Sequence, residues 1–145
     1  MMLVTGGVAS GKRTILQGLG YEPGDIASAD GLDLTLPAGV DEMTFLVGIA
    51  DQLAACDAVV CTEVGSGVVP LDAGQRAWRE RAGRLACLLA ERADCVVRMV
   101  CGIPQVLKGE LVRRDGGLQV DSSVGGDDSP VADASARGDG RPWSC

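Results

Sequence analysis

The sequence predicts a single α/β domain with a mainly parallel sheet, and three observations predict it. Short segments rich in Val alternate along residues 2–100 with longer segments of helical periodicity. Twenty-one glycines against six prolines indicate many tight turns between short elements. The length of 145 residues is that of one domain with one core. Aromatic residues make up 3% of the chain, so this core must consist mainly of aliphatic side chains.

The expected strands are short and mostly uncharged. Residues 2–5, 58–62 and 95–100 each form an apolar run of the length typical of a buried strand in a parallel sheet. Residues 33–36 alternate over only four positions and are a candidate edge strand. Residues 101–108 are expected to form a turn and then a short extension.

Three helices are expected between these strands. The first covers residues 12–19 and ends at glycines. The second begins after Asp41, a helix-capping residue type, and its apolar residues recur at helical spacing. The third begins after Asp72, which has Gln75 three residues further on. A chain that alternates strands and helices in this way makes right-handed crossovers between parallel strands.

Charge and cysteine content indicate which binding partners and which cellular location to expect. A formal charge of −7, from 13 basic and 20 acidic residues, disfavours binding to nucleic acid and to acidic membrane surfaces. No apolar run approaches the ~20 residues of a membrane-spanning helix. Six cysteines, with no C-x-x-C pair and no signal peptide, predict reduced thiols in a cytoplasmic protein. The sequence contains no histidine, which excludes an imidazole base, a phosphohistidine and a histidine metal ligand.

Composition divides the chain into two regions. Residues 1–108 contain all of the expected helices and strands and are interpreted as the domain. Residues 109–145 are rich in Gly, Asp, Ser and Ala and have neither a helical nor an alternating period. They are therefore predicted to be a mostly disordered acidic tail.

A glycine-rich loop follows the first expected strand and leads into the first helix. Its sequence fits the phosphate-binding pattern G-x-x-x-x-G-K. In such a loop the backbone N–H groups turn inward, the helix N-terminus adds partial positive charge, and the lysine reaches the terminal phosphates. The alternative is a chance glycine turn. The loop predicts a nucleotide site formed by Gly6, Gly7, Val8, Ala9, Ser10, Gly11, Lys12, Arg13 and Thr14.

One position departs from this pattern. The residue after the lysine is ordinarily Ser or Thr, whose hydroxyl binds Mg²⁺, and here it is Arg13. Thr14 is one position late, and a helix turns about 100° per residue, so its hydroxyl is expected to point elsewhere. Two interpretations of Arg13 stay open: it neutralises a phosphate, or it is solvated.

Glu63 directly follows the second strand, at the end of a parallel sheet where ligands bind. With Lys12 it is a candidate catalytic residue, and it is the candidate metal ligand, either holding Mg²⁺ through water or orienting a substrate hydroxyl. The alternative is a structural carboxylate that caps a loop or pairs with Arg79 or Arg84.

Two blocks of motifs lie within residues 1–20 and 58–109. The first block is Leu3-Val4-Thr5-Gly6-Gly7 with Ser10-Gly11-Lys12. The second is more specific and consists of Glu63-Val64-Gly65, Gly67, Val69-Pro70, Arg76, Arg79, Ala82-Gly83-Arg84, Ala93-Asp94, Gly102-Ile103-Pro104 and Leu107-Lys108-Gly109. In these two blocks the chain resembles the adenosylcobinamide kinase and adenosylcobinamide-phosphate guanylyltransferase family of cobalamin biosynthesis.

The resemblance implies a P-loop nucleotide-binding fold with GTP or ATP as the phosphoryl donor. It implies a corrinoid acceptor, phosphorylated at the hydroxyl of its aminopropanol arm, then a transfer of GMP to that phosphate through a histidine, and a trimeric assembly. The arginines at 76–84 are candidates for binding phosphate or corrinoid amides, or else a solvated helix face.

Two features of this chain depart from the family. There is no histidine on which a GMP intermediate could form. The stretch between Gly20 and Ala58 is too short for the family's histidine helix together with its separate aspartate-ended strand, and neither Asp30 nor Asp33 there matches a family motif.

Three functional hypotheses follow. The preferred one is a cobinamide-type kinase that retains phosphoryl transfer and lacks nucleotidyl transfer. The second is a degenerate, noncatalytic relative that binds nucleotide or corrinoid as a regulator or partner subunit. The third is a phosphate-loop kinase of another small molecule, because the fold and the loop do not fix the acceptor.

Overall fold

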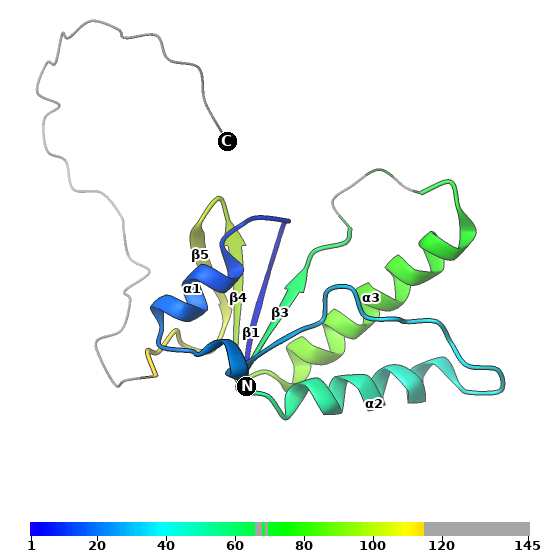
Figure 1. Cartoon of the computed structure of the whole chain (residues 1–145), viewed down its shortest axis with the longest axis horizontal. Helices are drawn as coiled ribbons and strands as arrows, with labels where there is room; N and C mark the ends of the chain where they lie inside the picture. Colours follow the sequence, from blue (N-terminus) through cyan, green and yellow to red (C-terminus); the bar gives the residue numbers. More distant parts are fainter. Residues whose placement is uncertain (66–67, 69, 115–145) are drawn as a thin grey trace, which may run out of the picture.

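The computed structural model describes residues 1–65, 68 and 70–114. This part of the chain forms a five-stranded sheet in the order β2-β3-β1-β4-β5 (Figure 1). Four strands are parallel and β5 is antiparallel to β4. The strands are β1 (Met2–Gly6), β2 (Ile26–Ser28), β3 (Ala58–Thr62), β4 (Cys95–Val100) and β5 (Ile103–Lys108). The predicted α/β class with a mainly parallel sheet is confirmed.

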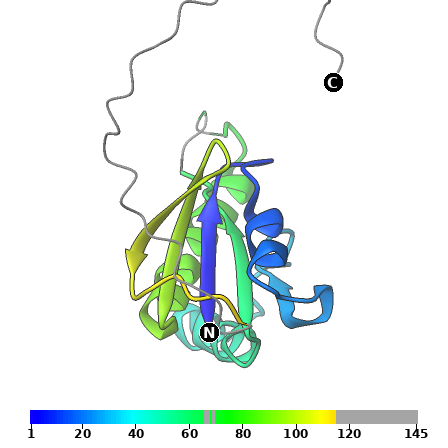
Figure 2. The ribbon, with the colours of Figure 1, turned by 90° about the vertical axis from the view of Figure 1, so that its left-hand side faces the viewer.

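Helices cover both faces of the sheet. α1 lies on one side, and α2 and α3 lie on the other (Figure 1). The helices are α1 (Lys12–Gly18), α2 (Glu42–Ala54) and α3 (Ala73–Arg92), and a 3₁₀ turn, η1, covers Pro23–Asp25. Viewed from the side of α1, the chain passes from β1 at the centre of the sheet directly into that helix (Figure 2). None of the helices in the described segments combines the length and apolarity of a bilayer crossing.

Both predicted helix starts carry the expected side-chain caps. The Asp41 carboxylate accepts a hydrogen bond from the Thr44 backbone N–H at 2.9 Å, and Asp72 does the same for Gln75 at 2.8 Å. Each bond satisfies a backbone donor of the first helical turn that has no partner within the helix.

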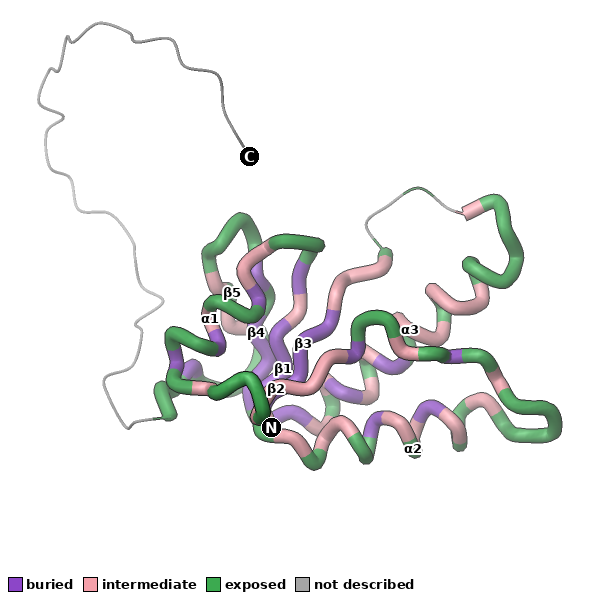
Figure 3. The backbone as a smooth tube through the Cα atoms, viewed as in Figure 1, coloured by how far each residue is buried: buried purple, intermediate pink, exposed green. Residues whose placement is uncertain are grey.

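The core has an aliphatic layer on each face of the sheet. Leu3, Val59 and Val96 face α2 and α3, whereas Val4, Val60 and Val97 face α1. This alternation follows from the period of two in a strand. Burial is concentrated on the strands and on the inward sides of the helices (Figure 3).

The candidate edge strand at residues 33–36 was wrong, and the edge strand is β2 instead. Ile26 of β2 pairs with Ala58 of β3. In the expected segment, the Asp33 side chain accepts a hydrogen bond from the Thr35 N–H at 2.9 Å. This local bond gives the backbone an alternative to strand pairing.

The expected extension after the 101–104 turn is a full strand, β5. Val100 pairs with Ile103, so Cys101 and Gly102 alone form the turn, with φ of 51° and 82°. Two consecutive residues with positive φ are the geometry that connects tightly paired antiparallel strands. The turn is therefore shorter than expected, and the extension begins at Ile103.

Residues 110–114 return across the amino ends of the strands. The chain turns at Gly109, where φ is +69° and an added Cβ would lie 2.1 Å from the Asp94 carbonyl oxygen. Leu111 is 5% exposed within the layer that faces α1, and the Arg114 N–H donates to the Leu19 carbonyl at 2.9 Å. Most of the predicted disordered tail, residues 115–145, lies outside the described residues.

Candidate functional site

The glycine-rich loop joins the end of β1 to the start of α1, at the carboxyl edge of the parallel strands. Only glycine fits at its first position, because a Cβ on Gly6 would lie 2.6 Å from the Met99 carbonyl oxygen. The loop also requires positive φ at Ala9 (57°) and at Gly11 (90°), the residue that precedes α1. These conformations curl the backbone around a small space at the helix N-terminus.

The side chain of Lys12 turns back over this loop. Its Nζ donates to the Gly7 carbonyl at 2.7 Å and to the Gly6 carbonyl at 3.2 Å. The residue is only 9% exposed. A buried ammonium needs hydrogen-bond acceptors, and the loop supplies two neutral ones. Phosphate oxygens would offer the same ammonium charged acceptors.

A cavity of about 380 Å³ opens beside the loop. Its lining comes from the loop, the first turn of α1 and the ends of β2 and β3: Val8, Ala9, Ser10, Gly11, Lys12, Arg13, Thr14, Asp30, Val60 and Thr62. Seven of the predicted site residues therefore meet there. Of the remaining three, Gly6 and Gly7 contribute the carbonyls that hold Lys12, and Glu63 does not line the cavity.

Two polar groups of the lining have no partner within the described residues. The Ser10 hydroxyl oxygen is buried and makes no hydrogen bond. The exposed Arg13 guanidinium has no carboxylate or carbonyl partner there, in contrast to the arginines of α3. An unsatisfied buried hydroxyl is unfavourable unless a ligand or water completes it.

Thr14, the last residue of the predicted nucleotide site, also lines the cavity. The lining therefore contains hydroxyl-bearing residues on both sides of Lys12, Ser10 before it and Thr14 after it.

Asp30 is the site residue that the sequence interpretation missed. It follows β2 and bridges to the end of β3, where its Oδ1 accepts from the Thr62 N–H at 2.6 Å and its Oδ2 accepts from the Thr62 hydroxyl at 2.9 Å. The stretch between Gly20 and Ala58, expected to be too short for the family's histidine helix together with an aspartate-ended strand, contains β2, which leads to Asp30, and α2, which carries no histidine. The signal was weak because β2 has only three residues.

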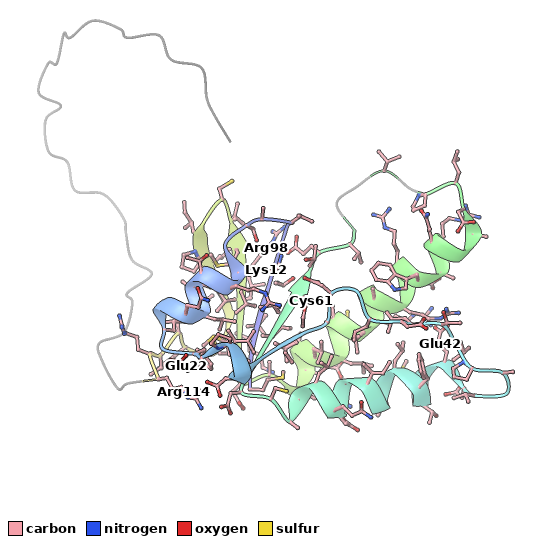
Figure 4. All side chains as sticks on the ribbon, viewed as in Figure 1. Lys12, Glu22, Glu42, Cys61, Arg98 and Arg114 are labelled. Carbon is pink, nitrogen blue, oxygen red and sulfur yellow. The ribbon has the colours of Figure 1, made fainter. Side chains whose placement is uncertain are left out.

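Glu63 is paired across the sheet. Its two carboxylate oxygens accept from Nε and Nη2 of Arg98 at 2.7 and 2.9 Å. This bond and the charge of Glu63 raise the pKa of the Arg98 guanidinium. Neither partner suggested by the sequence, Arg79 or Arg84, makes this contact. Lys12 and Arg98 lie at the same end of the sheet (Figure 4).

The arginines of α3 bind groups of the chain itself. Arg79 donates to the carbonyls of Val64 and Val68, the latter at 2.6 Å, and so holds the segment after β3. Arg81 and Arg84 both bind the Glu42 carboxylate of α2, at 3.0 and 2.7 Å (Figure 4). The arginine side chains of α3, predicted either to bind phosphate or to be solvated, are therefore mainly engaged in contacts within the protein.

Phosphoryl transfer requires Mg²⁺, and the cavity offers one carboxylate, Asp30, to hold it. No group of three or more His, Cys, Asp or Glu side chains gathers anywhere in the described ranges. Proteins commonly hold Mg²⁺ with one or two carboxylates plus phosphates of the substrate. Asp30 places one carboxylate in the cavity, so the residues present fit a Mg²⁺ site that the protein and the substrate phosphates form together.

Comparison with known proteins supports the interpretation of the second block of motifs. Residues 37–107 match the family model described as cobinamide kinase / cobinamide phosphate guanyltransferase. A 52-residue stretch is 44% identical to the bifunctional adenosylcobalamin biosynthesis protein CobP of Pseudomonas aeruginosa. That match covers 36% of this chain and 30% of the relative, so it spans less than a third of the relative's length.

The matched segment supplies α2, β3, α3, β4 and most of β5, while the glycine-rich loop precedes it. β3 and β4 are not neighbours in the sheet, because β1 pairs with both of them. The strand that carries the loop is therefore structurally integral to the matched segment. Through residues 37–107, the chain is similar to the cobinamide kinase / cobinamide phosphate guanyltransferase family.

Proposed function

We propose that this chain binds the phosphates of GTP or ATP in the cavity beside the loop and transfers a phosphoryl group to the hydroxyl of a corrinoid. One observation carries the proposal: Lys12 meets Arg13 and the Ser10 hydroxyl in one cavity at a helix N-terminus, and among the described residues neither Arg13 nor that hydroxyl has a side-chain partner. All three, together with the loop N–H groups, favour an anionic ligand with several oxygens. The match of residues 37–107 to the cobinamide kinase / cobinamide phosphate guanyltransferase model supports the corrinoid acceptor.

In this proposal each residue acts on the charge of the phosphates. Lys12 exchanges its two carbonyl acceptors for phosphate oxygens, and Arg13 adds a second cation on the solvent side. Asp30 and the phosphates would hold Mg²⁺, which supplies neutralisation of phosphate charge during transfer. Positioning and charge stabilisation account for most of the catalysis of phosphoryl transfer, so few other groups are needed.

A nucleotidyl-transfer step by the family's histidine is not part of the proposal, because the sequence has no histidine. Cys61 lies one residue before the end of β3, and burial raises the pKa of its thiol to about 11. It therefore stays protonated at neutral pH and is a poor nucleophile. We expect no GMP adduct after incubation with GTP. Intact-mass spectrometry checks this, and a mass increase equal to GMP would contradict it.

The proposal is tested with purified protein, adenosylcobinamide, Mg²⁺ and labelled GTP or ATP. We expect phosphorylated corrinoid with the wild type and none with Lys12→Ala, which also loses nucleotide binding in calorimetric titration. Lys108→Ala is the matched lysine control, since Lys108 caps carbonyls at the end of α3 far along the chain from the loop. Absence of saturable nucleotide binding at millimolar concentration would refute the proposal.

A noncatalytic nucleotide-binding subunit is the second candidate. It is favoured by Arg13 in the place of the usual hydroxyl ligand and by the engagement of both Glu63 oxygens with Arg98. The same experiment separates the two candidates, because this one predicts Lys12-dependent binding without turnover. A cytoplasmic location also remains part of the proposal, in keeping with the free thiols of the five described cysteines.

A further inference from the structure

We propose that Arg98 is a positioning residue for the phosphate loop. It holds Glu63 across the central strand and thereby fixes the backbone hydrogen bond from Glu63 to Gly6, the first residue of the loop. The inference rests on the proposed function for its effect on nucleotide affinity. Four hydrogen bonds support this inference. Two join Arg98 to Glu63, one joins Glu63 to Gly6, and one joins Gly6 to Lys12.

The bond from Glu63 to Gly6 is the last rung between β3 and β1. The Glu63 N–H donates to the Gly6 carbonyl at 3.0 Å, one residue beyond the end of β3 at Thr62. No further rung follows on that side, because the loop departs after Gly6. Terminal rungs open more readily than interior ones, so this bond needs support from outside the ladder.

That last rung determines where Lys12 finds its acceptors. The Gly6 carbonyl accepts both the Glu63 N–H and the Lys12 ammonium. Gly6 has φ of +146° and no side chain, so its backbone is intrinsically freer to rotate than that of other residues. If the rung opened, the carbonyls of Gly6 and Gly7 would no longer be held in the arrangement that places Lys12.

Arg98 supplies the support by a two-point contact. Nε and Nη2 donate to separate oxygens of Glu63, the parallel geometry in which a guanidinium and a carboxylate restrain each other's orientation. Thr5 of β1 pairs with Arg98 of β4 on one side and with Cys61 of β3 on the other. The contact therefore ties the two flanking strands together over the last residues of β1.

The contact lies on the opposite side of the sheet from the nucleotide cavity. Arg98 follows Val96 by two residues, so its side chain leaves the face covered by α2 and α3. α1 and the cavity-lining Val60 belong to the other face. Arg98 does not line the cavity, and its influence on the loop runs through the Glu63 backbone.

The first measurement is nucleotide affinity by calorimetry in EDTA, so that a metal-binding role of Glu63 is silent. Arg98→Leu and Glu63→Ala are each expected to weaken binding about three- to tenfold, and the double variant by the same factor as either alone. Arg98→Lys, which keeps the charge but loses the fork, is expected to recover part of the loss. Arg92→Leu is the matched control. It breaks the comparable contact of Arg92 with Asp51 at 2.8 Å and should leave affinity unchanged.

The second measurement is amide hydrogen exchange in the unliganded protein, followed by NMR. Arg98→Leu is expected to speed exchange of the Glu63 amide about tenfold or more, while the Ala29 amide, bonded to the Val60 carbonyl at 2.9 Å, stays unchanged. A purely stabilising role would lower the melting temperature as Arg92→Leu does, without this selective effect.

The outcomes separate this inference from the proposed function. Wild-type affinity in Arg98→Leu would overturn the inference and leave nucleotide binding intact. Additive losses in the double variant would also overturn it, since they would mean that Arg98 and Glu63 act separately. If the wild type binds no nucleotide, the proposed function fails, and the exchange rate of the Glu63 amide alone decides whether Arg98 holds the loop.

Discussion

Arg13 and Asp30 are the two residues whose placement most affects the chemistry of the cavity. Arg13 puts a cation where phosphate loops of this pattern carry a metal-binding hydroxyl. Asp30 reaches the same cavity from the end of β2, held by two hydrogen bonds from Thr62. A second cation reduces the need for a metal ion, whereas a single carboxylate together with substrate phosphates is enough to hold one.

The two carboxylates near the loop are expected to differ in their effect on Mg²⁺ dependence. Asp30→Asn should raise the Mg²⁺ concentration needed for half-maximal nucleotide binding or turnover about tenfold, because the amide keeps the shape and loses the charge that holds the ion. If Glu63 is the metal ligand predicted from the sequence, Glu63→Gln should raise the required Mg²⁺ concentration in the same way. Titration of Mg²⁺ at fixed nucleotide concentration measures both variants. An effect confined to Glu63→Gln would assign the ion to Glu63 and contradict the role of Asp30.

At the scale of single helices and strands, the sequence predicted the boundaries that depend on residues close together in the chain. The starts of α2 and α3 followed from Asp41 and Asp72, since a capping carboxylate acts within three residues. β2 and β5 depend on pairing with β3 and β4, which no short stretch of sequence encodes. Asp30 was missed for the same reason, because its partner Thr62 lies 32 positions away.

The cap of α2 gives a pH-dependent contribution to stability. The backbone and side-chain hydrogen bonds from Thr44 lower the pKa of the Asp41 carboxyl below its usual value. This stabilisation is present above the ordinary carboxyl pKa and is lost as the pH falls through the lowered one. Asp41→Asn should therefore keep a cap without this pH dependence, and Asp41→Ala should lower the melting temperature by a few degrees at pH 7.

Thermal unfolding between pH 7 and pH 2.5 checks the role of Asp41. The difference in melting temperature between wild type and Asp41→Asn should shrink or reverse at the acid end. A difference that stays constant with pH would mean that the ionised carboxylate contributes nothing beyond its shape.

At the scale of the whole molecule, the site depends on the order of strands in the sheet. The family match begins at residue 37, whereas the loop lies at residues 6–12 on a strand inserted between β3 and β4. That order brings Lys12, Asp30 and Thr62 to one cavity from three separate regions of the chain. The motif pattern predicted the loop by itself, but the contribution of the sheet edge to the site required the three-dimensional arrangement.

The fold also depends on the segment that follows β5, residues 110–114. Leu111 is buried in the layer that faces α1. The guanidinium of Arg114 lies 5.4 Å above the Tyr21 ring, binds Asp25 and reaches Asp57 at 2.5 Å (Figure 4). These contacts tie the end of α1 and the approaches to β2 and β3 to the segment that follows β5. Residues 110–114 are therefore expected to be required, and residues 115–145 to be dispensable.

Two truncations test this expectation. Ending the chain after Arg114 should leave the melting temperature and the nucleotide affinity nearly unchanged, because the contacts of Leu111 and Arg114 remain. Ending it after Gly109 removes a buried leucine, a loss that ordinarily costs about 2–5 kcal/mol, and should lower the free energy of unfolding by at least the smaller amount. Chemical denaturation measures both. Equal stability of the two truncated chains would mean that Leu111 and Arg114 contribute little, whereas a large loss from the longer one would place essential contacts beyond Arg114.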